Sequence, residues 1–211
     1  MGRREDNKAK KRTDLEAAAL RLFLGQGFHA TTIEQIAAEA GVARGTFYLY
    51  FDDKETIFRT LVGAVLDPAV DALVDARKAL DEAMDEDGTQ AAYLVLAQAL
   101  IEAVSQNPEA TLLFYREQRN PGSVGDWLRS RGAQLDAFVA DLLSSLMVRG
   151  LIRKTDDRFV ALAILGAIDR LVYAWLCGHL PDDPWPVARE VVQLFGAALV
   201  NTDQEPVAPS T

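Results

Sequence analysis

The side chains best suited to chemistry in this chain gather in one short stretch, residues 31–58. The guanidinium of Arg44 can form two parallel hydrogen bonds with guanine, and Gly45 beside it has no side chain to hold a partner surface away. Around them lie hydroxyl and ammonium groups that can reach phosphates, and phenol rings that can contact a thymine methyl group. The candidate set is Thr32, Arg44, Gly45, Thr46, Tyr48, Tyr50 and Lys54. This chemistry indicates a surface for double-stranded DNA.

A helix and a glycine turn are expected to position these residues. Thr31 with Glu34, or Thr32 with Gln35 one residue later, has the spacing of a capping box at a helix start. Gly41 follows the apolar face of that helix, where a tight turn needs a residue that tolerates positive φ. Two helices joined by such a turn form a helix-turn-helix. Its second helix can enter the major groove of DNA, which is about 12 Å wide and admits one helix.

The second helix is expected over residues 43–51. It buries Phe47 and Phe51 and leaves the candidate DNA contacts on its other faces. Lys54 begins the next helix and is expected to reach a phosphate. The alternative is a pair of solvent-facing helices whose tyrosines are amphipathic surface residues.

The same stretch resembles the DNA-binding region of the tetracycline-repressor (TetR) family of bacterial transcription regulators. The matching motifs are Thr32-Ile33, Ile36-Ala37, Ala40-Gly41-Val42, Gly45-Thr46-Phe47-Tyr48, Tyr50-Phe51 and Lys54-Glu55-x-Ile57. The similarity covers about residues 13–60, and beyond residue 60 only the number of helices and the total length are similar. Tyr50 stands where the family more often has histidine, and either side chain can donate to a phosphate.

The resemblance implies an all-α fold with two parts. An N-terminal three-helix DNA-binding domain with the helix-turn-helix is expected over residues 1–55. A C-terminal helical domain for effector binding and dimerisation is expected over residues 56–201. The implied function is a homodimeric repressor on a palindromic operator, released by a small-molecule effector. A ligand-independent DNA-binding or protein-interaction dimer of the same fold, and a helical enzyme, are the alternatives.

Charge is distributed unevenly along the chain. The net charge is −9, but residues 1–60 carry a net +1 and residues 61–211 a net −10. The first 13 residues hold six basic side chains. We expect residues 1–12 to be a flexible basic arm that adds affinity for DNA phosphates, with a solubilising tail as the alternative. The polar, proline-containing residues 202–211 are expected to be a disordered tail.

Apolar residues recur at intervals of three and four, which indicates helices throughout. Pro68 either ends or only bends the helix that begins near Asp53, because proline lacks a backbone donor. The chain then has ten helices or nine. The expected ranges are 13–26, 32–40, 43–51, 53–67, 68–85, 89–105, 109–119, 124–149, 157–177 and 184–200.

The last two helices are expected to pair two subunits. The helix over residues 157–177 is apolar on more than one side, and the helix over residues 184–200 repeats this pattern. A helix that is apolar nearly all round must be buried all round. The alternative is a central core helix of a monomer. The longest apolar run, residues 159–168, is shorter than the about 20 residues of a membrane-spanning helix, so no membrane span is expected.

A mostly apolar effector site is expected between residues 93 and 176. Its candidate residues are Phe114, Tyr115, Trp127, Asp169 and Trp175. Asp169 as the polar contact would favour a hydrophobic, neutral or cationic effector over an anionic one. Aromatic residues at helical spacing are also typical of an ordinary core, and Arg116 and Glu117 are expected on the surface.

The sequence offers no case for catalysis, a metal or a cofactor. It has no Gly-x-Ser-x-Gly, glycine-rich phosphate loop or His-Glu-x-x-His motif. Cys177 is the single cysteine, and the only histidines, His29 and His179, lie 150 residues apart. We therefore expect a cytoplasmic protein with a reduced thiol that is not an enzyme.

Overall fold

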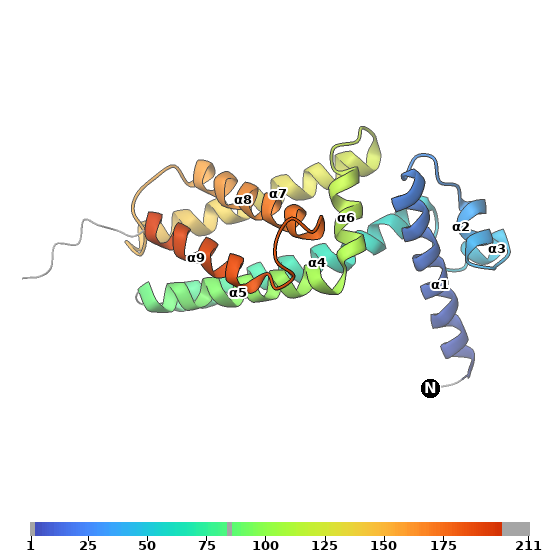
Figure 1. The fold of residues 1–211 in the computed structure, drawn as a ribbon, viewed down its shortest axis with the longest axis horizontal. Helices are drawn as coiled ribbons and strands as arrows, with labels where there is room; N and C mark the ends of the chain where they lie inside the picture. The colour runs from blue at the N-terminus through green and yellow to red at the C-terminus, as the bar shows by residue number, and fades with distance from the viewer. Residues whose placement is uncertain (1–2, 84–85, 200–211) are drawn as a thin grey trace, which may run out of the picture. The chain divides into compact units, whose positions relative to one another are not determined.

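Every element of secondary structure in the described residues of the computed structural model, 3–83 and 86–199, is an α-helix (Figure 1). Within these residues nine helices follow one another: α1 (Arg3–Gln26), α2 (Ile33–Glu39), α3 (Arg44–Phe47), α4 (Lys54–Glu82), α5 (Glu86–Gln106), α6 (Pro108–Glu117), α7 (Ser123–Val148), α8 (Asp157–Leu176) and α9 (Trp185–Leu199). The all-α prediction is confirmed. The predicted tail over residues 202–211 lies outside the described residues.

The helices form two compact units, each described here by itself. The first unit comprises residues 1–67 and 103–129, and the second comprises residues 68–102 and 130–211, within the limits of the described residues. The first unit therefore contains α6 and the beginnings of α4 and α7 in addition to α1–α3. The predicted boundary between residues 55 and 56 concerns DNA and effector binding, and it stays a prediction.

Aromatic side chains form the core of the first unit. The ring centroid of Phe28 lies 5.4 Å from that of Phe23 and 5.3 Å from that of Phe58. All three side chains are buried because α1, α4 and the connection between α1 and α2 meet there. Gly27 ends α1 with φ +90°, a conformation that side chains other than glycine rarely adopt. This core fixes the position of the connection that leads into α2.

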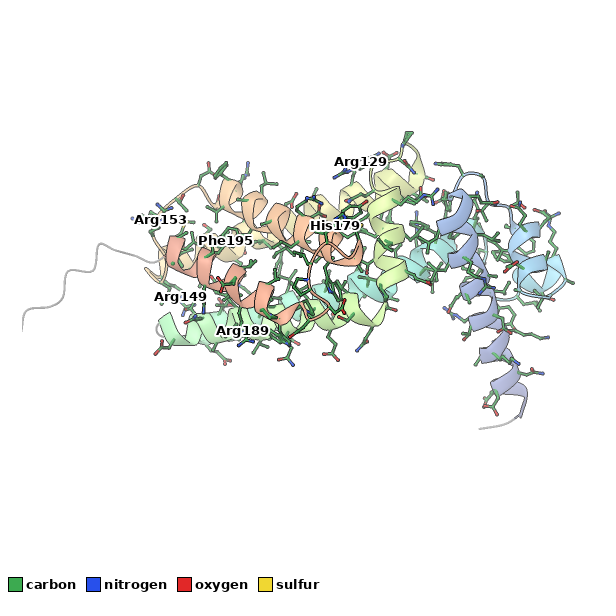
Figure 2. All side chains as sticks on the ribbon, in the orientation of Figure 1. Arg129, Arg149, Arg153, His179, Arg189 and Phe195 are labelled. Atoms are coloured by element: carbon green, nitrogen blue, oxygen red, sulfur yellow. The ribbon has the colours of Figure 1, made fainter. Side chains whose placement is uncertain are left out.

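The core of the second unit lies among α4, α5, α7 and α8. Leu80, Leu146 and Ala161 are almost completely buried in it. Side chains near the end of α7 also bind neighbouring carbonyls. Arg149 donates to the carbonyls of Leu80 and Ala83, and Arg153 Nε donates to Ala198 O of α9 at 2.7 Å. Both arginines lie at this end of α7 (Figure 2).

Helix α1 begins at Arg3, about ten residues earlier than expected. The prediction of a flexible arm is therefore wrong for residues 3–12, and residues 1–2 lie outside the described chain. Lysine, arginine and alanine favour helices, and Glu5 and Asp6 lie in the first turn, where acidic side chains stabilise a helix. Arg12 pairs with Glu16 one turn later at 2.9 Å. Side chains 5–13 are exposed, so the basic residues stay available to a partner.

Helix α4 continues through Pro68. This outcome matches the nine-helix alternative, in which the proline bends a helix instead of ending it. Proline removes one backbone donor, but the hydrogen bonds on either side can hold a long helix together. The helix therefore runs without interruption from the first unit into the second.

Helix α8 is apolar and largely uncovered. An 18-residue window within it has a mean hydropathy of 1.8 and is 11% buried. By length and composition alone it is the one helix of the described residues that could cross a membrane, and the expectation that no segment does so stays a prediction. Asp169 and Arg170 interrupt the apolar sequence near its middle. An uncovered apolar helix of this kind suits a partner helix as well as it suits lipid.

Candidate nucleic-acid interface

A capping box begins α2, at the second of the two predicted positions. Thr32 Oγ1 accepts a hydrogen bond from Gln35 N at 3.2 Å, and Gln35 Oε1 accepts one from Thr32 N at 2.9 Å. Thr31 is instead buried and donates its hydroxyl to Gly27 O at 2.8 Å. Thr32 is exposed, so its hydroxyl proton can still reach a phosphate.

Gly41 makes the turn between α2 and α3, as the sequence predicts. Its φ is +67°, and Val42 N donates to Ala37 O at 2.9 Å across the turn. Any other L-residue would be strained in this conformation. The turn leads directly to Ala43, the residue before α3.

Helix α3 is shorter than the predicted 43–51, because regular helix covers only Arg44–Phe47. Beyond it the chain continues in tighter turns, with Leu49 N bonded to Thr46 O and Tyr50 N bonded to Phe47 O. Phe47 is completely buried, so the first-unit core holds this segment.

The outward surface of this segment is built from four residues. Arg44, Gly45, Tyr48 and Leu49 are all exposed, and an added Cβ on Gly45 would meet no described atom within 4 Å. Arg44 Nη2 donates to Tyr48 Oη at 3.4 Å, which places both side chains on one side of the segment. Tyr50 is half-buried against the first-unit core and Thr46 is half-buried. We call Arg44, Gly45, Tyr48 and Leu49 the recognition surface.

Leu49 was not among the sequence-predicted contacts. Its side chain is 74% exposed, whereas Phe47 and Phe51 on either side are buried. The sequence did contain one signal. Leu49 lies midway between Phe47 and Phe51, which are four residues apart on the buried face of a helix, so Leu49 is expected on another face.

Arg44 is held by an acidic neighbour in the absence of DNA. Its Nε lies 2.9 Å from Glu34 Oε1, and both side chains are more than half exposed. The hydrogen bond with Tyr48 and the charge of Glu34 raise the pKa of Arg44. An ion pair this exposed is screened by solvent and contributes little, so another partner can replace Glu34 easily.

Lys54 does not point to solvent as a phosphate contact would. Its Nζ donates to the carbonyls of Phe28 and Thr31, both at 2.7 Å, and lies 3.4 Å from the carbonyl of His29. It also lies 4.4 Å from the ring centroid of Phe28. Burial lowers the pKa of Lys54, and Glu117 and Glu55 oppose that shift. An ammonium group has three protons, and three carbonyls already face them. The geometry gives Lys54 a structural role, and the predicted phosphate contact stays a prediction.

Helix α6 binds the same connection from another side. Glu117 is 1% exposed, and its carboxylate accepts hydrogen bonds from Phe28 N at 3.3 Å and Asn120 Nδ2 at 2.8 Å. Arg116 donates to Leu24 O, and His29 Nε2 lies 3.2 Å from Pro121 O. The expectation of a surface position is thus wrong for Glu117. Its partner lies 89 residues earlier, so no local pattern announces the contact.

The five predicted effector residues fall in different units. Phe114, Tyr115 and Trp127 belong to the first unit, where Phe114 and Trp127 pack against its core and Arg59 lies 5.4 Å from the Trp127 ring centroid. Asp169 and Trp175 belong to the second unit, where Trp175 Nε1 donates to Asp182 O at 3.2 Å.

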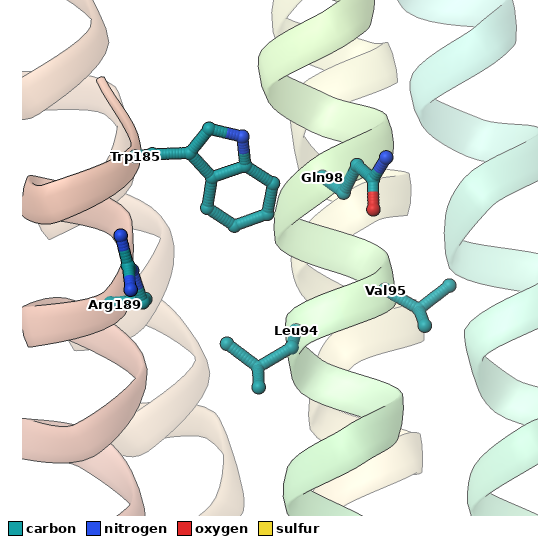
Figure 3. A pocket seen from close by; sticks show the side chains of 5 residues that line it. All are labelled: Leu94, Val95, Gln98, Trp185 and Arg189. Atoms are coloured by element: carbon teal, nitrogen blue, oxygen red, sulfur yellow. The ribbon is translucent and has the colours of Figure 1, made fainter. Parts of the chain in front are cut away.

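A groove in the second unit lies elsewhere, between α5 and α9 (Figure 3). Its volume is about 400 Å³, and it is lined by Leu94, Val95, Gln98, Trp185 and Arg189. None of the five predicted residues lines it. They stay a prediction for the effector site, and the groove adds a second candidate location.

The part of the chain that contains the recognition surface is similar to a known protein family. Residues 15–61 match the model of bacterial regulatory proteins of the tetR family. The uncharacterized HTH-type transcriptional regulator YerO of Bacillus subtilis (strain 168) is 26% identical over 157 residues, which are 68% of this chain and 54% of YerO. The chain thus spans about half of the length of that relative.

Two solved structures share the fold over most of the chain. NalD, the secondary repressor of the MexAB-OprM multidrug efflux pump in Pseudomonas aeruginosa, superposes with a TM-score of 0.71 at 22% identity, covering 93% of this chain and 99% of NalD. FadR from Bacillus subtilis in complex with stearoyl-CoA gives 0.67 at 20% identity, covering 89% and 98%. At these identities the likeness concerns the fold. Together with the family match over residues 15–61 and the helix-turn-helix geometry, it shows that this chain contains a helix-turn-helix region of the tetR family of bacterial regulatory proteins.

Proposed function

We propose that this chain is a homodimeric transcriptional repressor that binds a palindromic operator and leaves it when a small molecule binds the second unit. The recognition surface is the observation that carries the proposal. The second helix of the helix-turn-helix is the element with which such folds contact base edges. It presents an exposed arginine, an exposed tyrosine hydroxyl and a glycine that leaves room for close approach. Residues 61–211 carry a net charge of −10, so they would repel DNA phosphates. DNA binding through a broad basic surface that ignores sequence is therefore less favoured than binding through the recognition surface.

The exposed apolar residues of α8 and α9 support the dimer. Phe159 is 70% exposed, Leu162 58% and Leu194 67%. A single chain gains nothing from leaving these side chains in water, whereas burying them against the same helices of a second copy stabilises both. A two-fold dimer also presents two recognition surfaces to two half-sites.

Light scattering at micromolar concentration tests the dimer. Leu194→Glu places a charge on the proposed interface and should give monomers. Val148→Glu changes a valine that is 85% exposed on α7 and should stay dimeric. Wild-type protein that runs as a monomer would contradict the proposal.

The effector is proposed to be hydrophobic, as the sequence predicts, but the groove changes the expected charge. Its lining contains one charged side chain, the guanidinium of Arg189, among apolar and amide groups. An apolar molecule with an acidic group suits this lining better than the cation that Asp169 would favour. The structure of B. subtilis FadR with stearoyl-CoA is a relative in fold that holds a ligand of this general chemistry.

Helix α4 is the proposed link between effector and operator. It begins with Lys54, which binds the connection between α1 and α2, and continues through Pro68 into the second unit. An effector that favours one position of α4 would change the spacing of the two recognition surfaces. It must bind that arrangement more tightly than the DNA-bound one, since equal affinity shifts nothing.

Selection of operator DNA tests the whole proposal. Purified protein is used to enrich binding sequences from a random duplex library, and the enriched site is assayed by gel shift against a scrambled duplex. The proposal expects a two-fold symmetric site. Failure to enrich any sequence would overturn it, whereas enrichment without release by any effector would favour the ligand-independent regulator.

A further inference from the structure

We propose that Leu49 contacts the methyl group of a thymine in each operator half-site, and that this contact sets part of the sequence preference. The inference rests on the proposed DNA-binding function and adds which base feature the surface recognises. It starts from the one large apolar side chain of the recognition surface.

The position of Leu49 within the fold separates it from core leucines. It follows Tyr48 directly, and its backbone N–H bonds to Thr46 O at 3.2 Å, so the turn that holds it is well defined. Phe47 and Phe51 on either side are buried, whereas Leu49 is 74% exposed. The core therefore fixes the backbone while the Leu49 side chain is left to solvent.

The neighbours of Leu49 determine what can cover it. Arg44 and Tyr48 supply a guanidinium and a hydroxyl, and Gly45, four residues earlier, leaves open space beside the backbone. This combination suits a charged, grooved partner better than an apolar protein surface. Within the major groove the thymine methyl is the one exposed apolar group of the base edges, and apolar side chains contact it.

Removing the methyl group from the DNA gives a direct test. The operator is first isolated by selection from a random duplex library, and each thymine is then replaced singly by deoxyuridine, which lacks only that methyl group. We expect one position in each half-site where deoxyuridine weakens wild-type binding about fourfold, the factor for burying about one methyl group. Leu49→Ala removes the contact from both half-sites, so it should bind the thymine operator roughly sixteenfold more weakly, about fourfold for each half-site, and should no longer distinguish thymine from deoxyuridine at that position.

Two further variants keep the result interpretable. Leu49→Met retains an apolar side chain and should restore most of the thymine preference. Val148→Ala, at an equally exposed site on α7, should leave it unchanged. Because Leu49 is so exposed, these substitutions should not alter folding, and thermal unfolding of each variant checks this.

Two outcomes would overturn the assignment to Leu49. One is a Leu49→Ala protein that keeps the wild-type preference for thymine over deoxyuridine. The other is a wild-type protein indifferent to deoxyuridine at every position of the operator. Both are distinct from failure of the proposed function, in which no operator is enriched at all.

Discussion

The two units of this chain bury their apolar side chains to different degrees. In the first unit Leu15, Phe23, Phe47, Ile57 and Phe58 have no measurable exposure. In the second unit α8 has one buried residue, Ala161, and α9 has one, Leu199. The helices of the first unit thus bury their apolar side chains within one chain, whereas α8 and α9 leave most of theirs at least partly exposed.

Both units have polar side chains bound to the backbone, as Arg149 is to the carbonyls of Leu80 and Ala83 in the second unit. In the first unit Lys54 and Glu117 are bound to backbone groups of the connection between α1 and α2. In the second unit the ion pair between Lys78 and Asp75 is exposed. The contacts of Lys54 and Glu117 hold the connection that leads into the helix-turn-helix.

Matched phenylalanine substitutions should reveal the largest difference in stability between the two units. Phe58→Ala removes a completely buried ring from the first-unit core and should lower the free energy of unfolding by about 3–5 kcal/mol at every protein concentration. Phe159→Ala removes a ring that is mostly exposed on α8, so its cost should come through dimerisation and grow with protein concentration. Urea unfolding of both variants over a range of concentrations measures this. Equal, concentration-independent losses would show that Phe159 is a core residue of one chain.

Matched lysine substitutions should have the next largest effect. Lys54→Met removes the hydrogen bonds to two partly buried carbonyls, those of Phe28 and Thr31, and should lower the free energy of unfolding by about 1–3 kcal/mol. Lys78→Met removes an exposed ion pair and should leave the free energy of unfolding almost unchanged. Lys54→Met should also leave the salt dependence of DNA binding unchanged. A salt slope lower by about one, with unchanged stability, would restore the phosphate role for Lys54.

The groove of the second unit predicts an order of ligand affinities. Among a fatty acid, the alcohol and the amine of equal chain length, the acid should bind best because Arg189 is the one charge of the lining. Arg189→Gln should weaken the acid about tenfold and the alcohol little, as for loss of one charged hydrogen-bond partner. Tryptophan fluorescence follows binding, with Arg158→Gln as the control. Preference for the amine would instead favour an effector site in which Asp169 is the polar contact.

Tyr93 should give the smallest effect, and one of opposite sign. Its buried hydroxyl has no hydrogen-bond partner in the structure, and burial raises its pKa to about 12. Tyr93→Phe should therefore raise the free energy of unfolding by about 1 kcal/mol at neutral pH. The raised pKa favours the neutral phenol in the folded state, so wild-type stability is lost as the pH rises from about 10 to about 12. The phenylalanine variant should lose less over that range in alkaline unfolding curves, and an equal loss would show that other groups dominate.

Short-range signals allowed the helix-turn-helix to be predicted from the sequence. The capping box at Thr32, the positive φ at Gly41 and the burial of Phe47 and Phe51 each depend on residues a few positions apart. The helical fold and the passage of α4 through Pro68 follow from the same local patterns, the latter as one of two alternatives.

The remaining features depend on distant parts of the chain. Glu117 binds Phe28 across 89 residues, and the carbonyls that occupy Lys54 lie more than 20 residues before it. Such contacts bury Glu117, which was expected at the surface, and give Lys54 structural partners that no local pattern indicates. The groove between α5 and α9 likewise joins residues 94–98 with residues 185–189, which no spacing in the sequence relates.

Sequence discrimination by Arg44 tests the central claim most directly. Fluorescence anisotropy compares wild-type protein and Arg44→Ala on the selected operator and on a scrambled duplex of equal length. The account predicts that Arg44→Ala loses about 1–3 kcal/mol of binding free energy on the operator and much less on the scrambled duplex. Equal losses on both duplexes, or none on the operator, would contradict the assignment of the recognition surface.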